Sequence, residues 1–233
     1  MSAAEALSAP MEGLCVERDG RETPLSRPLA CEHRLRLYVD GAPCALFVCT
    51  RSHLRQLVLG RLCTDGRIAA AEDVLSLEFS EAEDEALVRL RPGAGKTAPR
   101  PLADRSAWRG EDIFRLAASM REAMPLHDAT AGAHGSLLLR YGEVLCCCED
   151  IGRHNAIDKA VGTALTEGAE ISECVLYTTG RIAVDIVRKA AAAGVCVLAS
   201  RALPTAEAVL LARELGLTLI GRAWEDRYEL FTP

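Results

Sequence analysis

Residues 174–221 decide the fold, and they read CVLYTTGRIAVDIVRKAAAAGVCVLASRALPTAEAVLLARELGLTLIG. Short apolar runs alternate here with segments of helical periodicity, which predicts strands at 174–177, 195–199 and 217–220 and helices at 181–193 and 205–215. Gly194 and Gly216 stand where helices should end, and Pro204 stands where one should begin. This alternation predicts a sheet with parallel strands that is covered by helices.

The segments upstream extend the pattern. A hairpin is expected at 137–140 and 144–148, turning at Tyr141-Gly142, with a helix at about 153–165. Further upstream, the patterns predict two strands between Glu32 and Phe47, a helix ending near Leu62, a strand pair at 74–79 and 86–90, and a helix at 111–124. We therefore expect an α/β protein with an α+β N-terminal part. Its divisions are a disordered tail at 1–13, a smaller α+β domain at 14–125 and a ligand-binding domain with a mixed sheet at 126–233.

Composition excludes several classes of protein. The chain has 233 residues, with 27 Lys+Arg against 33 Asp+Glu, so its formal net charge is −6. An acidic balance argues against a general nucleic-acid binder. No apolar run approaches the ~18 residues of a membrane helix, and the first twenty residues lack the pattern of a secretory signal. We expect a cytoplasmic protein that binds neither nucleic acid nor membrane.

The ten cysteines do not form a metal or disulfide pattern. Nothing indicates export, and no pair has C-x-x-C spacing, so neither a disulfide scaffold nor a structural metal site is predicted. Three of them are consecutive, at Cys146, Cys147 and Cys148, at the end of a predicted strand. Alternation along the strand should turn Cys146 and Cys148 to one face and Cys147 to the other. They either pack in the core or supply a thiolate at the mouth of a cationic pocket.

Polar residues follow each predicted strand of the C-terminal half, at the edge where ligands bind in such sheets. Arginines recur there near helix N-termini, which attract anions. One alternative is that these arginines are solvated loop residues; taken as a group, they predict a phosphate-binding rim. The stretches concerned are 149–155, 178–181, 200–201 and 221–222.

Two pairs with helical spacing lie in the first of these stretches. His154 and Asp158 are four residues apart, as are Asn155 and Lys159, so each pair shares a helix face. The Asp158 carboxylate could orient the imidazole for binding or acid–base work, or both could be ordinary surface groups. His134 precedes a predicted strand, and by itself it is weak evidence of a functional site.

The order of elements is also that of zinc-dependent nucleobase deaminases. Those enzymes need H-x-E at one helix start and P-C-x-x-C at the next. This chain has Arg153-His154-Asn155 and Thr179-Gly180-Arg181 at those places. The zinc ligands and the general-acid glutamate are absent, so a deaminase reaction is not predicted.

The block EDIGRHNAIDK at 149–159 resembles the signature of the formate dehydrogenase accessory sulfurtransferase family, FdhD. Further similar stretches are TGR at 179–181, LASR at 198–201, GLTLIG at 216–221, AGAH at 131–134 and LVLGRL at 57–62. The resemblance covers about residues 30 to 232, and the eleven-residue block is a specific signal.

The resemblance implies a cytidine-deaminase-like core and a protein that passes sulfur from a cysteine desulfurase to the molybdenum cofactor, which activates formate dehydrogenase. It implies a bis-molybdopterin guanine dinucleotide as the bound ligand, and it leaves a homodimer open. The implied binding residues are His134, Glu149, Asp150, Gly152, Arg153, His154, Asn155, Asp158, Lys159, Gly180, Arg181, Lys189, Ser200, Arg201, Arg222, Ala223, Trp224, Glu225, Asp226 and Arg227.

One departure bears on activity. The family carries a C-G-x-C-G loop whose first cysteine is the usual persulfide carrier, but the corresponding stretch here, Pro92 to Trp108, has no cysteine. A relay needs a thiolate that can attack and be attacked. Three hypotheses follow: a sulfurtransferase whose carrier has moved to Cys146, Cys147 or Cys148, a cofactor-binding chaperone without a relay, or a paralogue with another phosphate-containing ligand.

Overall fold

The computed structural model describes residues 3–95 and 108–233. Its N-terminal elements are α1 (Ala3–Ala6), β1 (Ser8–Val16), β2 (Glu22–Ala30), β3 (His33–Val39), β4 (Ala42–Cys49), α2 (Leu54–Thr64), η1 (Ala71–Asp73), β5 (Val74–Phe79) and β6 (Glu85–Leu90). Then come α3 (Gly110–Glu122), α4 (Pro125–Thr130), β7 (His134–Arg140), β8 (Glu143–Asp150), α5 (Arg153–Thr166), η3 (Ile171–Glu173), β9 (Cys174–Thr178), α6 (Val184–Ala193), β10 (Val197–Ser200), α7 (Ala206–Leu215), β11 (Thr218–Gly221) and β12 (Glu229–Thr232).

The C-terminal half forms a six-stranded mixed sheet in the order β12-β11-β10-β9-β7-β8. Strands β9, β10 and β11 are parallel, whereas β7 is antiparallel to both β9 and β8, and β12 is antiparallel to β11. The α/β class with a mixed sheet is therefore confirmed. The hairpin turns at Tyr141 and Gly142, whose φ angles of 51° and 80° suit a two-residue turn.

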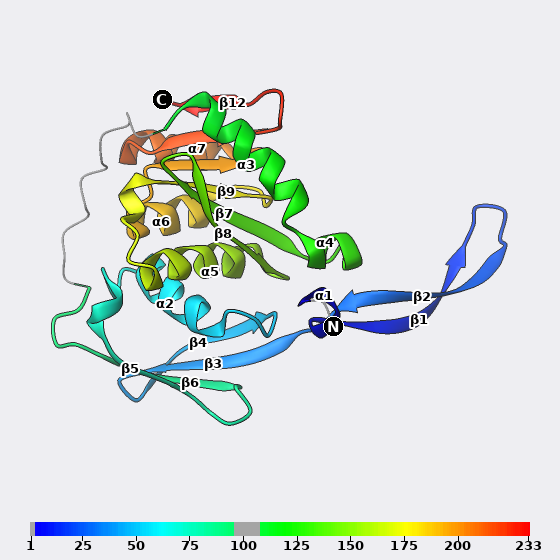
Figure 1. Ribbon diagram of the computed structural model, residues 1–233, viewed down its shortest axis with the longest axis horizontal. Coiled ribbons are helices and arrows are strands. Elements are labelled where there is room, and N and C mark those ends of the chain that lie inside the picture. Colours follow the sequence, from blue (N-terminus) through cyan, green and yellow to red (C-terminus); the bar gives the residue numbers. More distant parts are fainter. Residues whose placement is uncertain (1–2, 96–107) are drawn as a thin grey trace.

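Both faces of this sheet are buried, which explains the nearly continuous apolar strands. Leu138, Leu176 and Leu198 point to one face and join the larger core beneath α5 and α6. Their neighbours Leu137 and Tyr177 point to the other face and pack with residues of α3. In Figure 1 the helices α3 and α5 accordingly lie on opposite sides of the sheet.

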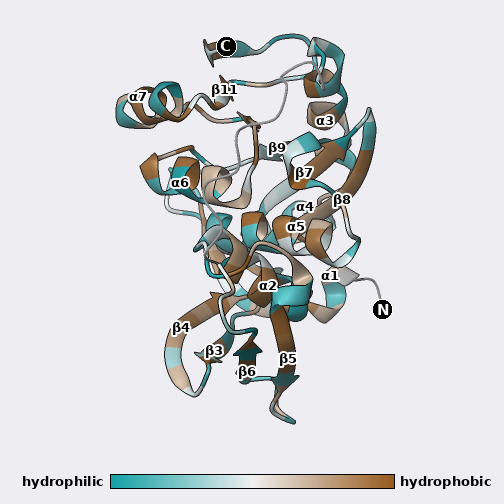
Figure 2. Cartoon of the chain, turned by 90° about the vertical axis from the view of Figure 1, so that its left-hand side faces the viewer, coloured by the Kyte–Doolittle hydropathy of each residue, from teal (hydrophilic) through white to brown (hydrophobic). Residues whose placement is uncertain are grey.

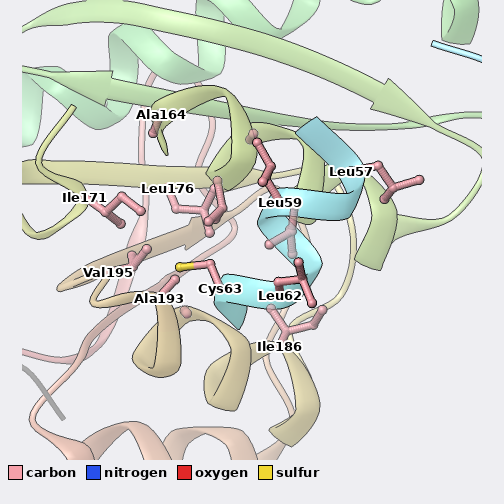
Figure 3. Close-up of a cluster of buried hydrophobic side chains, with 14 of the residues drawn as sticks. Leu57, Leu59, Leu62, Cys63, Ala164, Ile171, Leu176, Ile186, Ala193 and Val195 are labelled. Atoms are coloured by element: carbon pink, nitrogen blue, oxygen red, sulfur yellow. The ribbon is translucent and has the colours of Figure 1, made fainter. Parts of the chain in front are cut away.

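The N-terminal half forms a four-stranded sheet in the order β4-β3-β6-β5. Helix α2 lies between this sheet and α5, and its residues Leu57, Leu59, Leu62 and Cys63 point into the cluster shown in Figure 3. The larger core extends without interruption from the four-stranded sheet through α2 and α5 to the six-stranded sheet. Among the helices that the structure describes, none covers the outer face of the four-stranded sheet (Figure 2).

Two glycines bring α2 and α5 into close contact. A Cβ atom on Gly60 would lie 1.7 Å from the carbonyl oxygen of Asp158. A Cβ atom on Gly162 would lie 1.9 Å from the carbonyl oxygen of Gln56. The two helix backbones therefore touch, and only glycine fits at either position.

The prediction of a disordered tail at residues 1–13 is wrong for residues 3–13, which the structure describes. Residues 3–6 form α1, and residues 8–16 form β1, which pairs in antiparallel register with β2. The two strands form an arm that projects from the body (Figure 1). Most side chains of the arm are exposed, so no face is buried to impose the alternating pattern that marks a strand in sequence.

The packing of α3 does not follow the expected division at residue 125. Its buried residues Ile113 and Leu116 contact the six-stranded sheet rather than the N-terminal half. The short helix α4 and the edge strand β12 were not predicted. Within the described part of the chain, no helix is long and apolar enough to span a membrane.

Candidate functional site

The topology brings the predicted polar stretches to one edge of the six-stranded sheet. Strand β8 runs parallel to β9 because β7 is antiparallel to both. Asp150 and Thr178 therefore end the two strands that flank β7, and Ser200 ends β10 next to β9, all at the same edge of the sheet. His134 begins β7 beside Asp150. This edge is where ligands bind in sheets with parallel strands.

A pocket of about 540 Å³ opens at this edge. It is lined by Met124, His127, Ala131, Gly132, Ala133, His134, Ile151, Thr179 and Arg201. A second pocket of about 230 Å³ is lined by Ala117, Met120, Arg121, Tyr177, Arg201, Ala223, Trp224 and Glu225. Arg201 lines both, and its guanidinium lies 4.5 Å from the centre of the Trp224 ring. Together they offer a cationic wall and an aromatic face.

His134 is fixed at the start of β7. Its Nδ1 lies 3.3 Å from Oγ1 of Thr179, and that oxygen accepts the backbone N–H of Gly135 at 3.1 Å. Burial, together with the positive charge of Arg153 and His127, lowers the pKa of His134. This imidazole is therefore neutral at pH 7 and can exchange a hydrogen bond with a ligand.

Arg153 is the first residue of α5. Its side chain packs on Gly180, where a Cβ atom would approach the Cβ of Arg153 to 2.9 Å. Among the residues that the structure describes, nothing hydrogen bonds its Nε atom, which is shielded from solvent. A buried donor without a partner is costly, so this guanidinium is suited to an anion at the helix N-terminus.

A buried ion pair holds the turn that carries Arg153. Lys159 Nζ lies 2.6 Å from Oδ2 of Asp150, and neither side chain is exposed. Asp150 Oδ1 accepts the Gly152 N–H and the Asn155 side-chain N–H, each at 2.9 Å. Thr50 of the N-terminal half donates to the same carboxylate. The pair therefore ties the site to the four-stranded sheet.

A second buried pair joins three helices. Lys189 Nζ of α6 donates to Asp158 Oδ1 of α5 at 2.7 Å and to Thr64 Oγ1 of α2 at 2.9 Å. Burial raises the pKa of Asp158, and the charge of Lys189 opposes this shift. Closer to the surface, His154 Nε2 lies 2.7 Å from Asp185 Oδ2.

Comparisons with known proteins show the family of this chain. The FdhD/NarQ family model matches residues 94–233, which is more than half of the chain. The chain belongs to the FdhD/NarQ family. Curated relatives named sulfur carrier protein FdhD include one from Geobacillus kaustophilus, 29% identical over 92% of each chain. Another, from Halalkalibacterium halodurans, is 30% identical over 88% of this chain and 86% of its own.

A crystal structure described as that of a formate dehydrogenase accessory protein, from Desulfotalea psychrophila, has the same fold. Its TM-score is 0.85, with 25% identity over 97% of both chains. The FdhD resemblance of the 149–159 block is thereby confirmed. The cytidine-deaminase-like description of the core stays a prediction.

Several of the predicted binding residues lie beneath the site instead of facing it. The structure buries Asp150, Asp158, Lys159, Gly180, Lys189, Ser200 and Ala223. The paired charges satisfy one another, so in this conformation they position the surrounding loops and do not reach a ligand. Neither alternative for His154 and Asp158 is confirmed: Asp158 binds Lys189 while His154 binds Asp185, and Asp158 is buried instead of being a surface group. Asn155 and Lys159, expected on one face of the helix, both contact Asp150.

The remaining signature residues are closer to the surface. Glu149 accepts backbone N–H groups of α4, and Gly152 precedes α5. In the stretch 222–227, Arg222 lies 3.5 Å from Glu229, Glu225 lies 3.2 Å from Arg121, and Tyr177 OH donates to the Ala223 carbonyl at 2.6 Å. Arg181, Asp226 and Arg227 are exposed, and Trp224 lies at the second pocket.

The three consecutive cysteines do not lie at the pocket. Cys146 and Cys148 face α5, where their thiols approach Ala160 O and Thr163 Oγ1, and Cys147 faces Ala123 on the opposite side, as alternation predicts. Burial raises the pKa of Cys147 to about 12, and the hydrogen bond with Cys148 raises that of Cys146. The same hydrogen bond lowers the pKa of Cys148, but this residue is only 2% exposed. The hypothesis of a carrier at these positions is therefore not supported by their packing.

Sequence reasoning missed His127 at this pocket. The residue lies on α4, a six-residue helix without the periodicity of a longer one, and the neighbouring motif residues gave no signal for it. Most of the stretch that replaces the C-G-x-C-G loop, residues 96–107, lies outside the described residues.

Proposed function

We propose that this protein binds the molybdenum cofactor, as a bis-molybdopterin guanine dinucleotide, and serves the maturation of formate dehydrogenase. The observation that carries the proposal is the pocket at the sheet edge, where Arg201 lines two adjoining cavities. Next to it, Arg153 acts electrostatically on the pocket residue His134 and has a shielded Nε without a partner among the described residues. The names of the sulfur carrier relatives and of the accessory protein from Desulfotalea psychrophila support the biological role.

The donor set fits a phosphate group. Two guanidinium groups and the N-terminus of α5 supply positive charge at one edge, and such charge-assisted bonds are the strong ones. The Trp224 ring, already stacked on Arg201, offers a face on which a planar base could pack. These residues would bind and orient the dinucleotide, while the molybdenum centre is the cargo on which sulfur chemistry takes place.

Binding of guanosine diphosphate, measured by isothermal titration calorimetry, tests this proposal. Arg201→Ala should weaken binding at least about tenfold, because a hydrogen bond to a charged group contributes ~1.5–3 kcal/mol. Arg213→Ala is the matched control, since Arg213 is exposed in the last turn of α7, away from this edge. Equal affinity of both variants and the wild type, or no binding by the wild type, would contradict the proposed site.

A second candidate function is that of a sulfur carrier loaded by a cysteine desulfurase. Cys31 is exposed directly after β2, and the neighbouring Ala30 lies against Gly132 at the pocket. Among the described cysteines, only Cys15 and Cys31 are classed as exposed. A thiol at the root of the arm is therefore accessible and close to the site, which Cys146, Cys147 and Cys148 are not.

Persulfide loading separates the two candidates. The purified protein is incubated with a cysteine desulfurase and labelled cysteine, and protein-bound sulfur is mapped by mass spectrometry. A cofactor-binding protein without a relay should carry no sulfur. Sulfur on Cys31, lost in Cys31→Ser and retained in Cys15→Ser, would establish the carrier function instead.

A further inference from the structure

His127 is held at the pocket by two sets of contacts. Glu149 fixes the start of α4, because its carboxylate oxygens accept the backbone N–H groups of Leu126 and His127 at 2.9 and 2.8 Å. The ring is fixed separately, since its Nδ1 lies 2.8 Å from the carbonyl oxygen of Ala133. The side chain thus has a defined place beside His134 and Arg201.

The contact with Ala133 also determines the tautomer. A carbonyl oxygen only accepts hydrogen bonds, so Nδ1 of His127 must carry the proton. The neutral ring then has its lone pair on Nε2. Within residues 3–95 and 108–233, no group is hydrogen bonded to that nitrogen. The lone pair on Nε2 of His127 is therefore available to a ligand in the pocket.

Both negatively and positively charged groups lie near His127. Glu149 of β8 and Asp128 of α4 are negative; burial raises the pKa of Glu149, and its hydrogen bonds from the backbone N–H groups of Leu126 and His127 lower it. Arg201 after β10 and His134 of β7 line the same pocket as His127, and Arg153 of α5 acts electrostatically on His134. The carboxylate of Glu149 can thus compensate a positive imidazole at His127. Burial and the positive charge of Arg153 instead favour the neutral form of His134 by lowering its pKa.

We propose that His127 is a ligand-binding residue of this pocket that becomes an imidazolium when a phosphate group binds, while His134 stays neutral. One proton is taken up from solvent onto Nε2, which then donates a hydrogen bond to a phosphate oxygen as Nδ1 continues to donate to Ala133. No covalent bond other than this N–H bond forms. The inference rests on the proposed binding of a phosphate-bearing cofactor, and it adds that binding takes up a proton at His127, a residue outside the 149–159 block.

Nitrogen NMR of the histidine rings tests the proposal. The chain has five histidines, so their ring signals can be assigned by single substitutions. In the free protein at pH 8, His127 should show the less common tautomer with the proton on Nδ1. On addition of guanosine diphosphate, both of its ring nitrogens should move to imidazolium shifts, and those of His134 should not.

Two substitutions of His127 connect these nitrogen shifts to the affinity for guanosine diphosphate. In His127→Phe, guanosine diphosphate should bind about tenfold more weakly at pH 6.5 because a charge-assisted hydrogen bond is lost. As the pH rises through the range in which binding takes up the proton, the wild type should lose up to about tenfold in affinity for guanosine diphosphate per pH unit, relative to His127→Phe. His127→Gln keeps an amide donor without a titrating group, so part of the affinity should return without that pH dependence. His33→Gln is the control, since His33 contacts the Glu83 carbonyl in the four-stranded sheet.

The outcomes distinguish this inference from the proposed function. If guanosine diphosphate binds and the His127 signals keep their neutral shifts, or if His127→Phe keeps the wild-type pH dependence, the role of His127 is wrong and the binding site stands. If the wild type does not bind guanosine diphosphate at all, both proposals are wrong. Imidazolium shifts at His134 instead of His127 would also overturn the inference.

Discussion

At the scale of single residues, the charged members of the 149–159 block act on one another. Asp150 and Lys159 are fully buried, 2.6 Å apart, with Thr50 and Asn155 completing the hydrogen bonds. Removing one partner of such a pair leaves an uncompensated buried charge, whereas removing both can be nearly neutral. The 149–159 block therefore supplies Arg153 and also the buried ion pair that supports the turn on which Arg153 lies.

Lys159→Met should lower the free energy of unfolding by about 3–5 kcal/mol, because Asp150 is left charged and buried. The double variant with Asp150→Asn should recover part of this loss, which double-mutant cycles detect as coupling. Urea unfolding followed by circular dichroism gives the values. Additive losses in the double variant would show that the two side chains do not interact energetically.

His134 should make the protein sensitive to mild acid. Its folded-state pKa lies below the unfolded value of about 6.5, so the unfolded chain binds the proton first as the pH falls. The contribution of His134 to stability is therefore complete above about pH 6.5 and declines below it. In His134→Gln, urea midpoints measured from pH 7.5 to 5 should fall less than in the wild type. An unchanged profile would mean that the imidazole titrates normally in the folded state.

At the scale of elements, the contact between α2 and α5 is set by Gly60 and Gly162. Each glycine faces a backbone carbonyl of the other helix at a distance that admits no side-chain carbon. This contact seats the N-terminal sheet against the helix that begins at the site. Neither glycine belongs to a turn, so their role is visible only in the packed structure.

Gly162→Ala should cost at least about 3 kcal/mol, the upper end of the usual cost of overpacking, because the obstacle is backbone and cannot change rotamer. Gly13→Ala is the matched control. A Cβ atom at Gly13 in the exposed arm would meet only Leu25, at an ordinary 3.6 Å. Thermal unfolding of both variants measures the difference, and similar midpoints would mean that the helices can separate at little cost.

At the scale of the whole molecule, one core spans both sheets. It includes Leu35 and Leu37 of β3, Val58 of α2, Val161 of α5 and Leu198 of β10. The two halves therefore share most of the apolar surface that each buries. Shared burial makes independent unfolding costly, because separating the halves would expose α2 and α5 to water.

Unfolding should accordingly be a single cooperative transition. Tyrosine and tryptophan fluorescence and far-ultraviolet circular dichroism should give the same urea midpoint, since coincident probes mark two-state behaviour. A fragment of residues 126–233 should not fold alone, because it lacks α3 and leaves the Leu137 and Tyr177 face of the sheet uncovered. Two separated transitions, or a stable fragment, would contradict this.

Most of the helices and strands were predictable from the sequence, and the reason is burial. Strands β7, β9, β10 and β11 are covered on both faces, so their apolar runs are unbroken, and Gly194 and Gly216 end helices in the left-handed conformation. The arm was not predictable, because two exposed strands held by backbone pairing leave no pattern in the side chains.

For the site, the sequence by itself determined the family signature, the sheet edge and the positive charges gathered there. It also determined that no cysteine stands in the stretch 92–108. Only the tertiary structure decided which signature residues face the pocket, because burial and ion pairing depend on neighbours far along the chain, such as Thr50 beside Asp150 and Thr64 beside Asp158. It likewise brought His127 to the pocket and turned Cys146, Cys147 and Cys148 away from it, since the packing of α4 and α5 against the sheet sets those directions.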